Sequence, residues 1–143
     1  MTPDAAREKF TTARSAHLAT ADSSGTPHLV PIVFALHSNQ IAFAIDHKPK
    51  RTQNLRRLRN IAQNDRVSVL VDHYDEDWTQ LWWSRADGRA TISHDPPAQW
   101  LTRLTTRYPQ YAETPPQGPL VLITVERWQG WSYQAAGHDG VPR

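Results

Sequence analysis

The sequence predicts an α+β protein in which an antiparallel β-sheet closes on itself into a barrel and small helices lie at its periphery. Two observations predict this class: short apolar segments of strand length alternate with turn residues, and other segments space their apolar residues as helices do. The chain has 143 residues, enough for one domain with its own core. We place that domain at residues 1–134 and expect residues 135–143 to form a mobile C-terminal tail.

The N-terminal part predicts one helix followed by strands. Thr2, Pro3 and Asp4 are typical of an N-cap, a first helical position and a first-turn acid, so we expect a helix to about Ala16. Turn residues then separate apolar segments, and Pro31 within the second segment predicts a bulge or a sheet edge. The strands expected here, arranged as a meander, are 17–22, 27–36 and 41–45.

The remaining chain alternates helices and strands. A helix is predicted from about Arg51 to Gln63. An Asp87-Gly88 pair inside a long strand predicts a bulge or a tight turn. The helix has one apolar face, formed by Leu55, Leu58, Ile61 and Ala62, and leaves Arg56, Arg57 and Arg59 largely towards water. The other elements expected are strands at 67–71, 81–92 and 120–125 with a continuation over 126–133, a helix at 98–107 and an irregular connection at 109–119.

The composition excludes several classes of protein. The 16 basic and 14 acidic residues leave a net charge of only +2, which argues against nucleic-acid or membrane binding through bulk charge. There is no cysteine, so disulfides and thiolate chemistry are excluded. No apolar run reaches 18 residues and the N-terminus lacks signal-peptide features, so we expect a cytoplasmic protein without a membrane or nucleic-acid partner.

The most informative segment is the basic run between the strand that ends at Ile45 and the helix that follows it. Three cations, Lys48, Lys50 and Arg51, fall within four residues. A helix N-terminus offers unpaired N–H groups and the positive end of the helix dipole, so the run predicts a site for an anion such as phosphate. The alternative is a solvated basic loop.

The sequence offers no recognisable catalytic or metal-binding motif. The seven histidines include no pair at i, i+4 spacing, and we expect no metal site. No catalytic triad, phosphate-binding glycine loop or paired-carboxylate site is present, so no catalytic residue is assigned.

The order of these features resembles a known superfamily. Between about Ala16 and Tyr133 the chain is similar to the split β-barrel flavin and deazaflavin proteins, also called pyridoxamine-phosphate-oxidase-like. The short chain and the basic run resemble most the actinobacterial branch that uses coenzyme F420, an 8-hydroxy-5-deazaflavin. The matching pieces are Ala19-Thr20, Gly25-x-Pro27, Val30-Pro31-Ile32-Val33, Lys50-Arg51-Thr52-x-Asn54-Leu55, Asp65–Val71, Arg85–Ala90 and Ile123–Trp131.

The resemblance implies a Greek-key split barrel, FMN-binding-like, that forms a homodimer with the cofactor between two protomers. It implies phosphate contacts from Lys48, Lys50 and Arg51, with Arg56 or Arg57 reaching the oligoglutamate tail of F420. The cofactor ring would lie against Val30, Pro31, Ile32 and Val33. Additional contacts would come from Asp46, His47, Thr52, Asn54, Trp78 and Trp82. Helix capping by Thr52 and Asn54, a structural His47 and core packing of the apolar and aromatic residues are the alternatives.

The implied function is an F420-dependent oxidoreductase that transfers a hydride between the deazaflavin and a conjugated small-molecule substrate. Two alternatives stay open. One is an FMN-dependent oxidase or reductase on the same barrel, because FMN also brings a phosphate to a basic helix start. The other is a non-catalytic flavin- or haem-binding protein.

Overall fold

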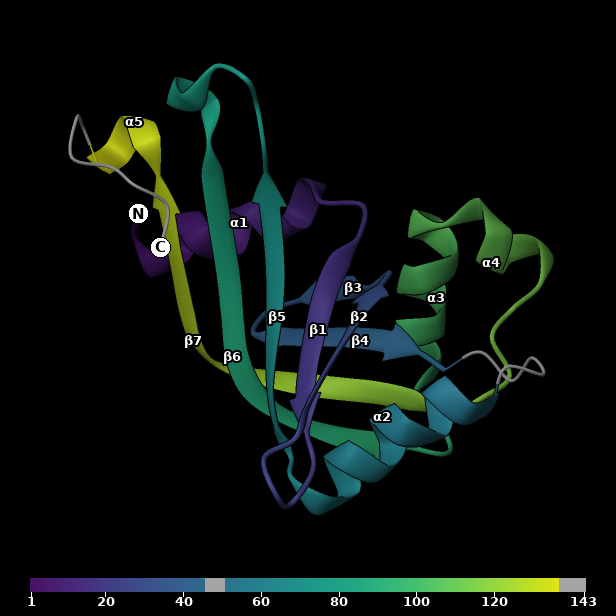
Figure 1. Ribbon diagram of the computed structural model, residues 1–143. Coiled ribbons are helices and arrows are strands. Elements are labelled where there is room, and N and C mark those ends of the chain that lie inside the picture. Colours follow the sequence, from purple (N-terminus) through teal and green to yellow (C-terminus); the bar gives the residue numbers. More distant parts are fainter. Residues whose placement is uncertain (46–50, 137–143) are drawn as a thin grey trace.

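The structure of the protein, a computed structural model, describes residues 1–45 and 51–136, and for 51–55 and 135–136 it describes the backbone alone. Within these residues the chain forms a seven-stranded antiparallel sheet with helices around it, which confirms the α+β class (Figure 1). The strands are β1 (Ala16–Ala21), β2 (Pro27–Ile32), β3 (Ala35–His37), β4 (Gln40–Ala44), β5 (Arg66–His73), β6 (Trp82–Ser93) and β7 (Leu120–Ser132).

The strand order makes the sheet curl. The order is β2-β1-β5-β6-β7-β4-β3, so β2 and β3 are the two edges. These edges are consecutive in the chain, and only Val33 and Phe34 lie between them. Two residues cannot span an open sheet of seven strands, because neighbouring strands are about 4.8 Å apart. The two edges must therefore lie near each other, as in a barrel.

The predicted strand at 27–36 is in fact two strands. The hydroxyl of Tyr108 accepts a hydrogen bond from the Phe34 backbone N–H at 3.1 Å, and Arg107 donates to the Phe34 carbonyl at 3.2 Å. The backbone N–H and carbonyl of Phe34 are therefore bonded to Tyr108 and Arg107, and the strand is interrupted at this residue. Both pairings of the predicted meander are present, but two separate strands make them: β2 pairs with β1, and β3 pairs with β4. Pro31 lies in an edge strand, which was one of its two predicted settings.

The helices follow the sequence signals closely at their starts. Thr2 is the N-cap of the first helix, since its hydroxyl oxygen accepts from the Ala5 N–H at 3.1 Å. This helix ends at Thr12 rather than near Ala16, because Ala13 is already extended and Ala16 begins β1. The helices are α1 (Pro3–Thr12), α2 (Arg51–Gln63), α3 (Ala98–Arg107), α4 (Pro109–Glu113) and α5 (Tyr133–Ala136), with a 3-10 turn, η1 (Trp78–Gln80). The predicted irregular connection thus begins with the short helix α4.

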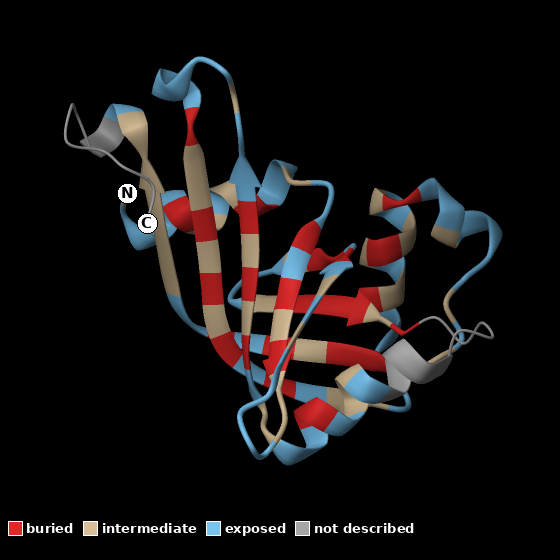
Figure 2. Cartoon of the chain, in the orientation of Figure 1, coloured by how far each residue is buried: buried red, intermediate tan, exposed pale blue. Residues whose placement is uncertain are grey.

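The core has two parts (Figure 2). The larger part fills the barrel with side chains from all strands together with Phe10 and Ile61. The smaller part lies between α3 and the sheet, where Trp100 and Leu104 pack with Ala42. Ile41, Ala42 and Phe43 are all buried because β4 faces the barrel on one side and α3 on the other.

Helix α2 is attached to the barrel by both an apolar and a polar contact. Ile61 is buried, and the Asn60 amide donates to the Thr20 hydroxyl at 3.1 Å with both residues buried. Ala62, expected on the apolar face, is exposed. Arg57, expected to face water, is half-buried. Both differences arise because the buried stripe is centred on Asn60 and Ile61 rather than on Ile61 and Ala62.

Strand β6 carries the predicted bulge. Its pairing with β7 shifts register between Asp87 and Gly88, and the strand continues beyond this point. A Cβ on Gly88 would meet the backbone carbonyl of Thr124 on β7. The absence of a side chain therefore permits the two strands to approach at the bulge.

We expect Gly88→Ala to lower the free energy of unfolding by about 1–3 kcal/mol, the usual cost of inserting a methyl group where there is no room. Chemical denaturation followed by circular dichroism measures this change. Because the obstacle is the backbone of Thr124, adding Thr124→Ala should not restore stability. Full rescue by that second substitution would contradict the explanation.

Candidate functional site

The predicted anion site falls mostly outside the described residues. We refer to residues 46–57 as the basic junction. Asp46, His47, Lys48 and Lys50 lie outside the described residues, and Arg51, Thr52 and Asn54 lie in the first turn of α2, where only the backbone is described. Their predicted contacts therefore stay predictions.

The chain that enters the basic junction is held in place. The backbone N–H of Ile45 donates to the Pro119 carbonyl at 2.9 Å, which extends the pairing of β4 and β7 by one residue. Gly118 lies so close that a Cβ there would meet the Ile45 carbonyl oxygen. The exit of β4 is thus fixed, and α2 begins at Arg51 a few residues later.

The second turn of α2 creates a positive potential next to β2. Arg57 is half-buried with its guanidinium 5.9 Å from the centre of the Phe43 ring, and burial lowers its pKa. The pKa of His28 on β2 is also lowered, first by burial and then by the charges of Arg56 and Arg57. Atom Nδ1 of His28 is buried without a hydrogen-bond partner among the described residues. The positive charges of α2 therefore act on β2 at His28.

The predicted ring-binding segment, Val30 to Val33, forms the end of β2 and the residue after it. Val30 is half-buried, Ile32 is buried, and Pro31 and Val33 are exposed. Because β2 is an edge strand, it has a strand partner, β1, on one side only within the described part of the chain. Its outer side can offer backbone groups to a ligand. The charges of Arg56 and Arg57 on α2 thus act on β2 at His28, two residues before the predicted ring segment.

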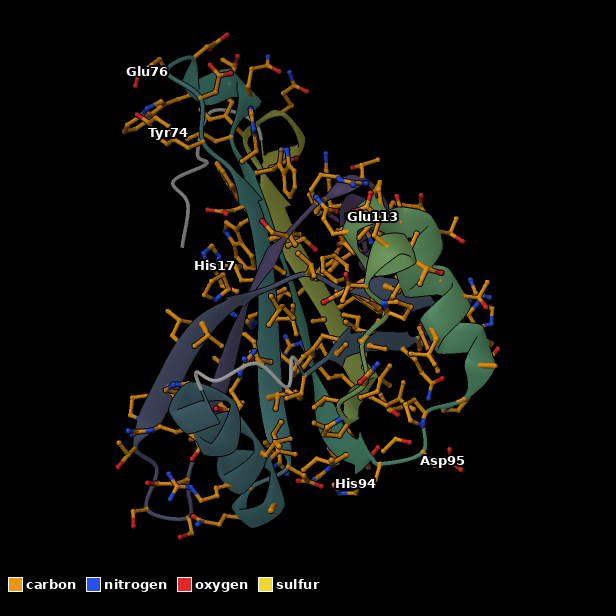
Figure 3. The ribbon with its side chains drawn as sticks, turned by 90° about the vertical axis from the view of Figure 1, so that its right-hand side faces the viewer. His17, Tyr74, Glu76, His94, Asp95 and Glu113 are labelled. Carbon is orange, nitrogen blue, oxygen red and sulfur yellow. The ribbon has the colours of Figure 1, made fainter. Side chains whose placement is uncertain are left out.

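The two predicted aromatic contacts lie elsewhere. Trp78 is in η1, at the tip of the arm formed by the β5–β6 connection, and Trp78 is 57% exposed to solvent. Trp82 is half-buried, with its ring stacked on His73 at 6.3 Å and Lys9 above it at 4.7 Å. The arm projects at one end of the sheet and α2 lies at the other (Figures 1 and 3). Within one chain, these tryptophans therefore lie away from α2.

A hollow on the outward face of the sheet was not predicted from the sequence. This sheet cleft has a volume of about 590 Å³ and a largely apolar lining. Figure 3 shows His17 on this face, on the side opposite to the α4 residue Glu113. The cleft is lined by His17, Ala19, Leu29, Ser68, Leu70, Asp72, Trp83 and Arg85. The sequence of β5 did hold a sign of this cleft. Successive side chains of a strand point to opposite faces, and Leu70 lies between the buried Val69 and Val71, so an apolar side chain faces outward.

A polar network holds Arg85 at the sheet cleft. The carboxylate of Asp87 accepts from the Ser68 hydroxyl at 2.7 Å and from Nε of Arg85 at 2.9 Å. Arg85 also donates to the Gln129 side chain at 3.2 Å and lies 5.6 Å from the Trp83 ring centre. These bonds orient the guanidinium before any ligand or partner arrives.

No group of three or more His, Cys, Asp or Glu side chains that could hold a metal ion occurs among the described residues. No described helix is both long and apolar enough to cross a membrane.

Comparison with known families decides the relationship. The family model described as pyridoxamine 5'-phosphate oxidase matches residues 2–132. The chain belongs to this family. Among curated proteins, no sequence matches the chain.

Solved structures share the fold of this family member. A conserved hypothetical protein, Rv2991, from Mycobacterium tuberculosis is 23% identical with a TM-score of 0.72, over 100% of this chain and 93% of that one. A FAD-binding protein from Mesorhizobium loti is 19% identical with a TM-score of 0.69, over 91% and 94% of the two chains. The haem storage protein HutZ from Vibrio cholerae is 17% identical with a TM-score of 0.68, over 92% and 95%. At these identities the likeness establishes the fold.

The pKa of His28 reports the electrostatic effect of the arginines on α2. Its pKa lies below the ordinary 6.5, so the neutral imidazole is favoured in the folded state. Its contribution to stability is complete above pH 6.5 and is lost as the pH falls through the folded-state pKa. We expect Arg56→Gln to raise the pKa of His28, as measured by an NMR titration of the imidazole protons. Arg127→Gln, on β7, is the control, and equal shifts in both variants would contradict a local effect.

Proposed function

We propose that this protein is an oxidoreductase that uses coenzyme F420 and transfers a hydride between the deazaflavin and a conjugated small-molecule substrate. One observation supports this most: a Lys- and Arg-rich segment leads directly into α2, and the charges of Arg56 and Arg57 on α2 act on His28 of the edge strand β2. A phosphate and a planar ring of one cofactor can therefore be bound by adjacent elements.

The phosphate would be bound at the start of α2. Backbone N–H groups in the first turn of a helix lack partners within the helix, and the helix dipole favours an anion there. Lys48, Lys50 and Arg51 would add charge-assisted hydrogen bonds. Thr52 and Asn54 would contribute neutral hydrogen bonds, and Asp46 and His47 would line the same pocket. Atom Nδ1 of His28, which is buried and has no hydrogen-bond partner in the described part of the chain, fits a polar ligand beside this helix.

The residues after the first turn favour a cofactor with further negative charge. Arg56 is exposed and can reach a carboxylate-rich tail such as that of F420. Arg57 is half-buried against Phe43, so its contribution is mainly to the local potential. FMN carries a phosphate but no such tail, which is why F420 is the first candidate.

The ring would lie along the outer side of β2. Backbone groups of Val30, Ile32 and Val33 can bond the polar edge of the ring, whereas Pro31 has no N–H to donate. When bound, the deazaflavin supplies the hydride chemistry. The chain contributes orientation and the exclusion of water through the apolar side chains of this segment. No acid or base of the chain is assigned.

Two other cofactors have specific support. The Mesorhizobium loti structure is titled as a FAD-binding protein and HutZ as a haem storage protein, so the same fold serves flavins and haem elsewhere. FMN, bound through the same basic junction, is the second candidate for an oxidase or reductase. Haem binding without catalysis is the third.

We place the complete site between two copies of the chain. The sheet cleft is largely apolar, and Leu29 at its border is 67% exposed. An exposed apolar surface of this kind is typical of an interface. Trp78 projects from its own chain on the β5–β6 arm, so in a homodimer it can approach the ring held by the other protomer, and Trp82 would support the base of that arm.

The cofactor is tested by titrating F420, FMN and haemin against tryptophan fluorescence and, for haemin, absorbance. We expect F420 to bind most tightly. Lys50→Ala combined with Arg51→Ala should weaken this binding by about 3 kcal/mol or more, roughly a hundredfold, because two charge-assisted bonds are lost. Arg59→Ala, an exposed position on the same helix, is the control and should have little effect. An unchanged dissociation constant in the double variant would place the phosphate elsewhere, and preference for FMN or haemin would select those candidates.

The homodimer is tested by light scattering coupled to size exclusion. We expect twice the mass of one chain for the natural protein. Leu29→Asp should yield single chains, because it places a charge within the proposed apolar interface. Gln110→Asp, exposed on α4, adds the same charge outside it and should leave the dimer intact. A natural protein that is already a single chain in solution would refute this part of the proposal.

A further inference from the structure

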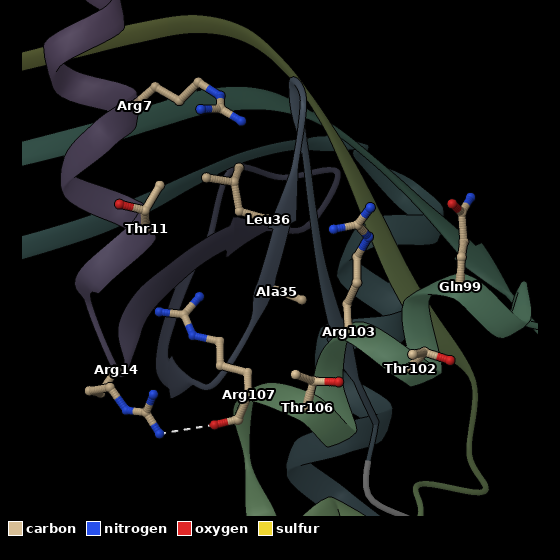
Figure 4. Close-up of a pocket in the computed structure, with 10 residues that line it drawn as sticks. All are labelled: Arg7, Thr11, Arg14, Ala35, Leu36, Gln99, Thr102, Arg103, Thr106 and Arg107. Atoms are coloured by element: carbon tan, nitrogen blue, oxygen red, sulfur yellow. Dashed lines mark hydrogen bonds between the residues drawn. The ribbon is translucent and has the colours of Figure 1, made fainter.

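A hollow distinct from the sheet cleft lies between α1 and α3, with β3 at its base (Figure 4). Its volume is about 750 Å³, within the range of small-molecule sites. Four arginines line it, which is a quarter of the 16 basic residues of the chain, and no carboxylate occurs among the described residues of its lining. The lining residues are Arg7, Thr11, Arg14, Ala35, Leu36, Gln99, Thr102, Arg103, Thr106 and Arg107. We refer to this hollow as the arginine cleft.

The charges in the arginine cleft are held mainly by neutral acceptors. Arg7 donates through Nε to the Ser38 carbonyl at 2.7 Å, and Arg14 donates to the Arg107 carbonyl at 3.0 Å. Arg7 also approaches Glu8 at 3.4 Å, but that carboxylate belongs to a side chain that is 68% exposed and lies outside the lining. Carbonyl partners orient a guanidinium without neutralising it, so the cleft keeps a positive potential.

Arg107 has a structural role that accounts for its own position. Its guanidinium donates to the carbonyls of Phe34, Phe10 and Ala13, and it lies 4.6 Å from the Phe34 ring centre. Burial lowers its pKa, and the charge of Arg14 lowers it further. Arg107 is therefore a partly buried cation that joins α3 to the end of α1 and to the residue before β3.

Arg103 has no such role. It is half-buried on α3, and no hydrogen bond or ion pair joins it to another residue in the described part of the chain. Figure 4 shows its guanidinium and that of Arg107 extending into the cleft from α3, with that of Arg7 reaching in from α1. Like charges gathered in this way repel one another, and an anion between them would remove the repulsion.

We propose that the arginine cleft binds a phosphorylated small molecule. Arg7, Arg103 and Arg107 would surround the phosphate groups, and the hydroxyls of Thr102 and Thr106 stand on the same wall as further donors. Ala35 and Leu36 supply an apolar base for the organic part of the ligand. This site is separate from the basic junction, because its elements are α1, α3 and β3 rather than α2 and β2.

The proposal is tested by calorimetric titration of the full chain with ADP, pyrophosphate and adenosine. We expect ADP and pyrophosphate to bind and adenosine not to bind. Arg103→Gln should weaken ADP binding roughly tenfold or more, because one charge-assisted contact is lost. Its thermal midpoint should stay close to that of the natural protein, since Arg103 makes no described bond. Arg127→Gln, which removes the same charge from an exposed position on β7, should bind ADP normally.

Three results would overturn the proposal. The first is the absence of ADP and pyrophosphate binding at millimolar concentration. The second is a result that shows a less specific site. Equal weakening of ADP binding by Arg103→Gln and Arg127→Gln would indicate a general charge effect, and tighter binding of a single-stranded oligonucleotide than of ADP would indicate a nucleic-acid surface. The third is loss of ADP binding in the Lys50→Ala, Arg51→Ala variant alone, which would place the phosphate at the basic junction. A failure of F420 binding leaves these outcomes unaffected.

Discussion

The clamp of Tyr108 and Arg107 on the backbone of Phe34 is the constraint on which the rest of the structure depends. The Tyr108 hydroxyl accepts from the Phe34 N–H and donates to the Phe34 carbonyl, and Arg107 donates to the same carbonyl and to that of Phe10 in α1. Because Phe34 is withdrawn from the sheet, β2 ends before it and β3 begins after it. The two strands can then form opposite edges of one sheet, and the sheet must curl to bring them together. A buried phenol and a partly buried guanidinium thereby determine that β2 keeps an open outer side.

Charge is distributed locally rather than over the whole molecule. The net charge is +2, yet burial and then the charges of Arg56 and Arg57 on α2 lower the pKa of His28, and the arginine cleft gathers four guanidinium groups with no carboxylate among its described lining residues. Both positive regions lie against the barrel, where the low-polarity core strengthens electrostatic interactions. Such regions suit small anions with defined shape better than long polyanions, because a long polyanion is attracted by charge spread over a surface.

The family relationship explains the barrel but leaves the chemistry to the site. Neighbours of the same fold are titled for FAD binding and for haem storage, so the fold supports more than one cofactor. The features of this chain that bear on its chemistry are the cations before and within α2 in the sequence, an apolar sheet cleft with an oriented Arg85, and an arm that carries Trp78 at the end of the sheet opposite to α2.

The sequence by itself determined the local features of this protein. The Thr2 cap and the start and end of α3 follow from interactions between residues close in the chain, and the Asp87-Gly88 pair and Pro31 were local signals for a bulge and for an edge strand. Only the tertiary structure decided the division of 27–36 into two strands, the burial of Asn60 and Arg57, the sheet cleft and the arginine cleft. Each of these depends on partners distant in sequence, such as Phe34 with Tyr108 or Asn60 with Thr20, and periodicity within a segment carries no information about which distant group will meet it.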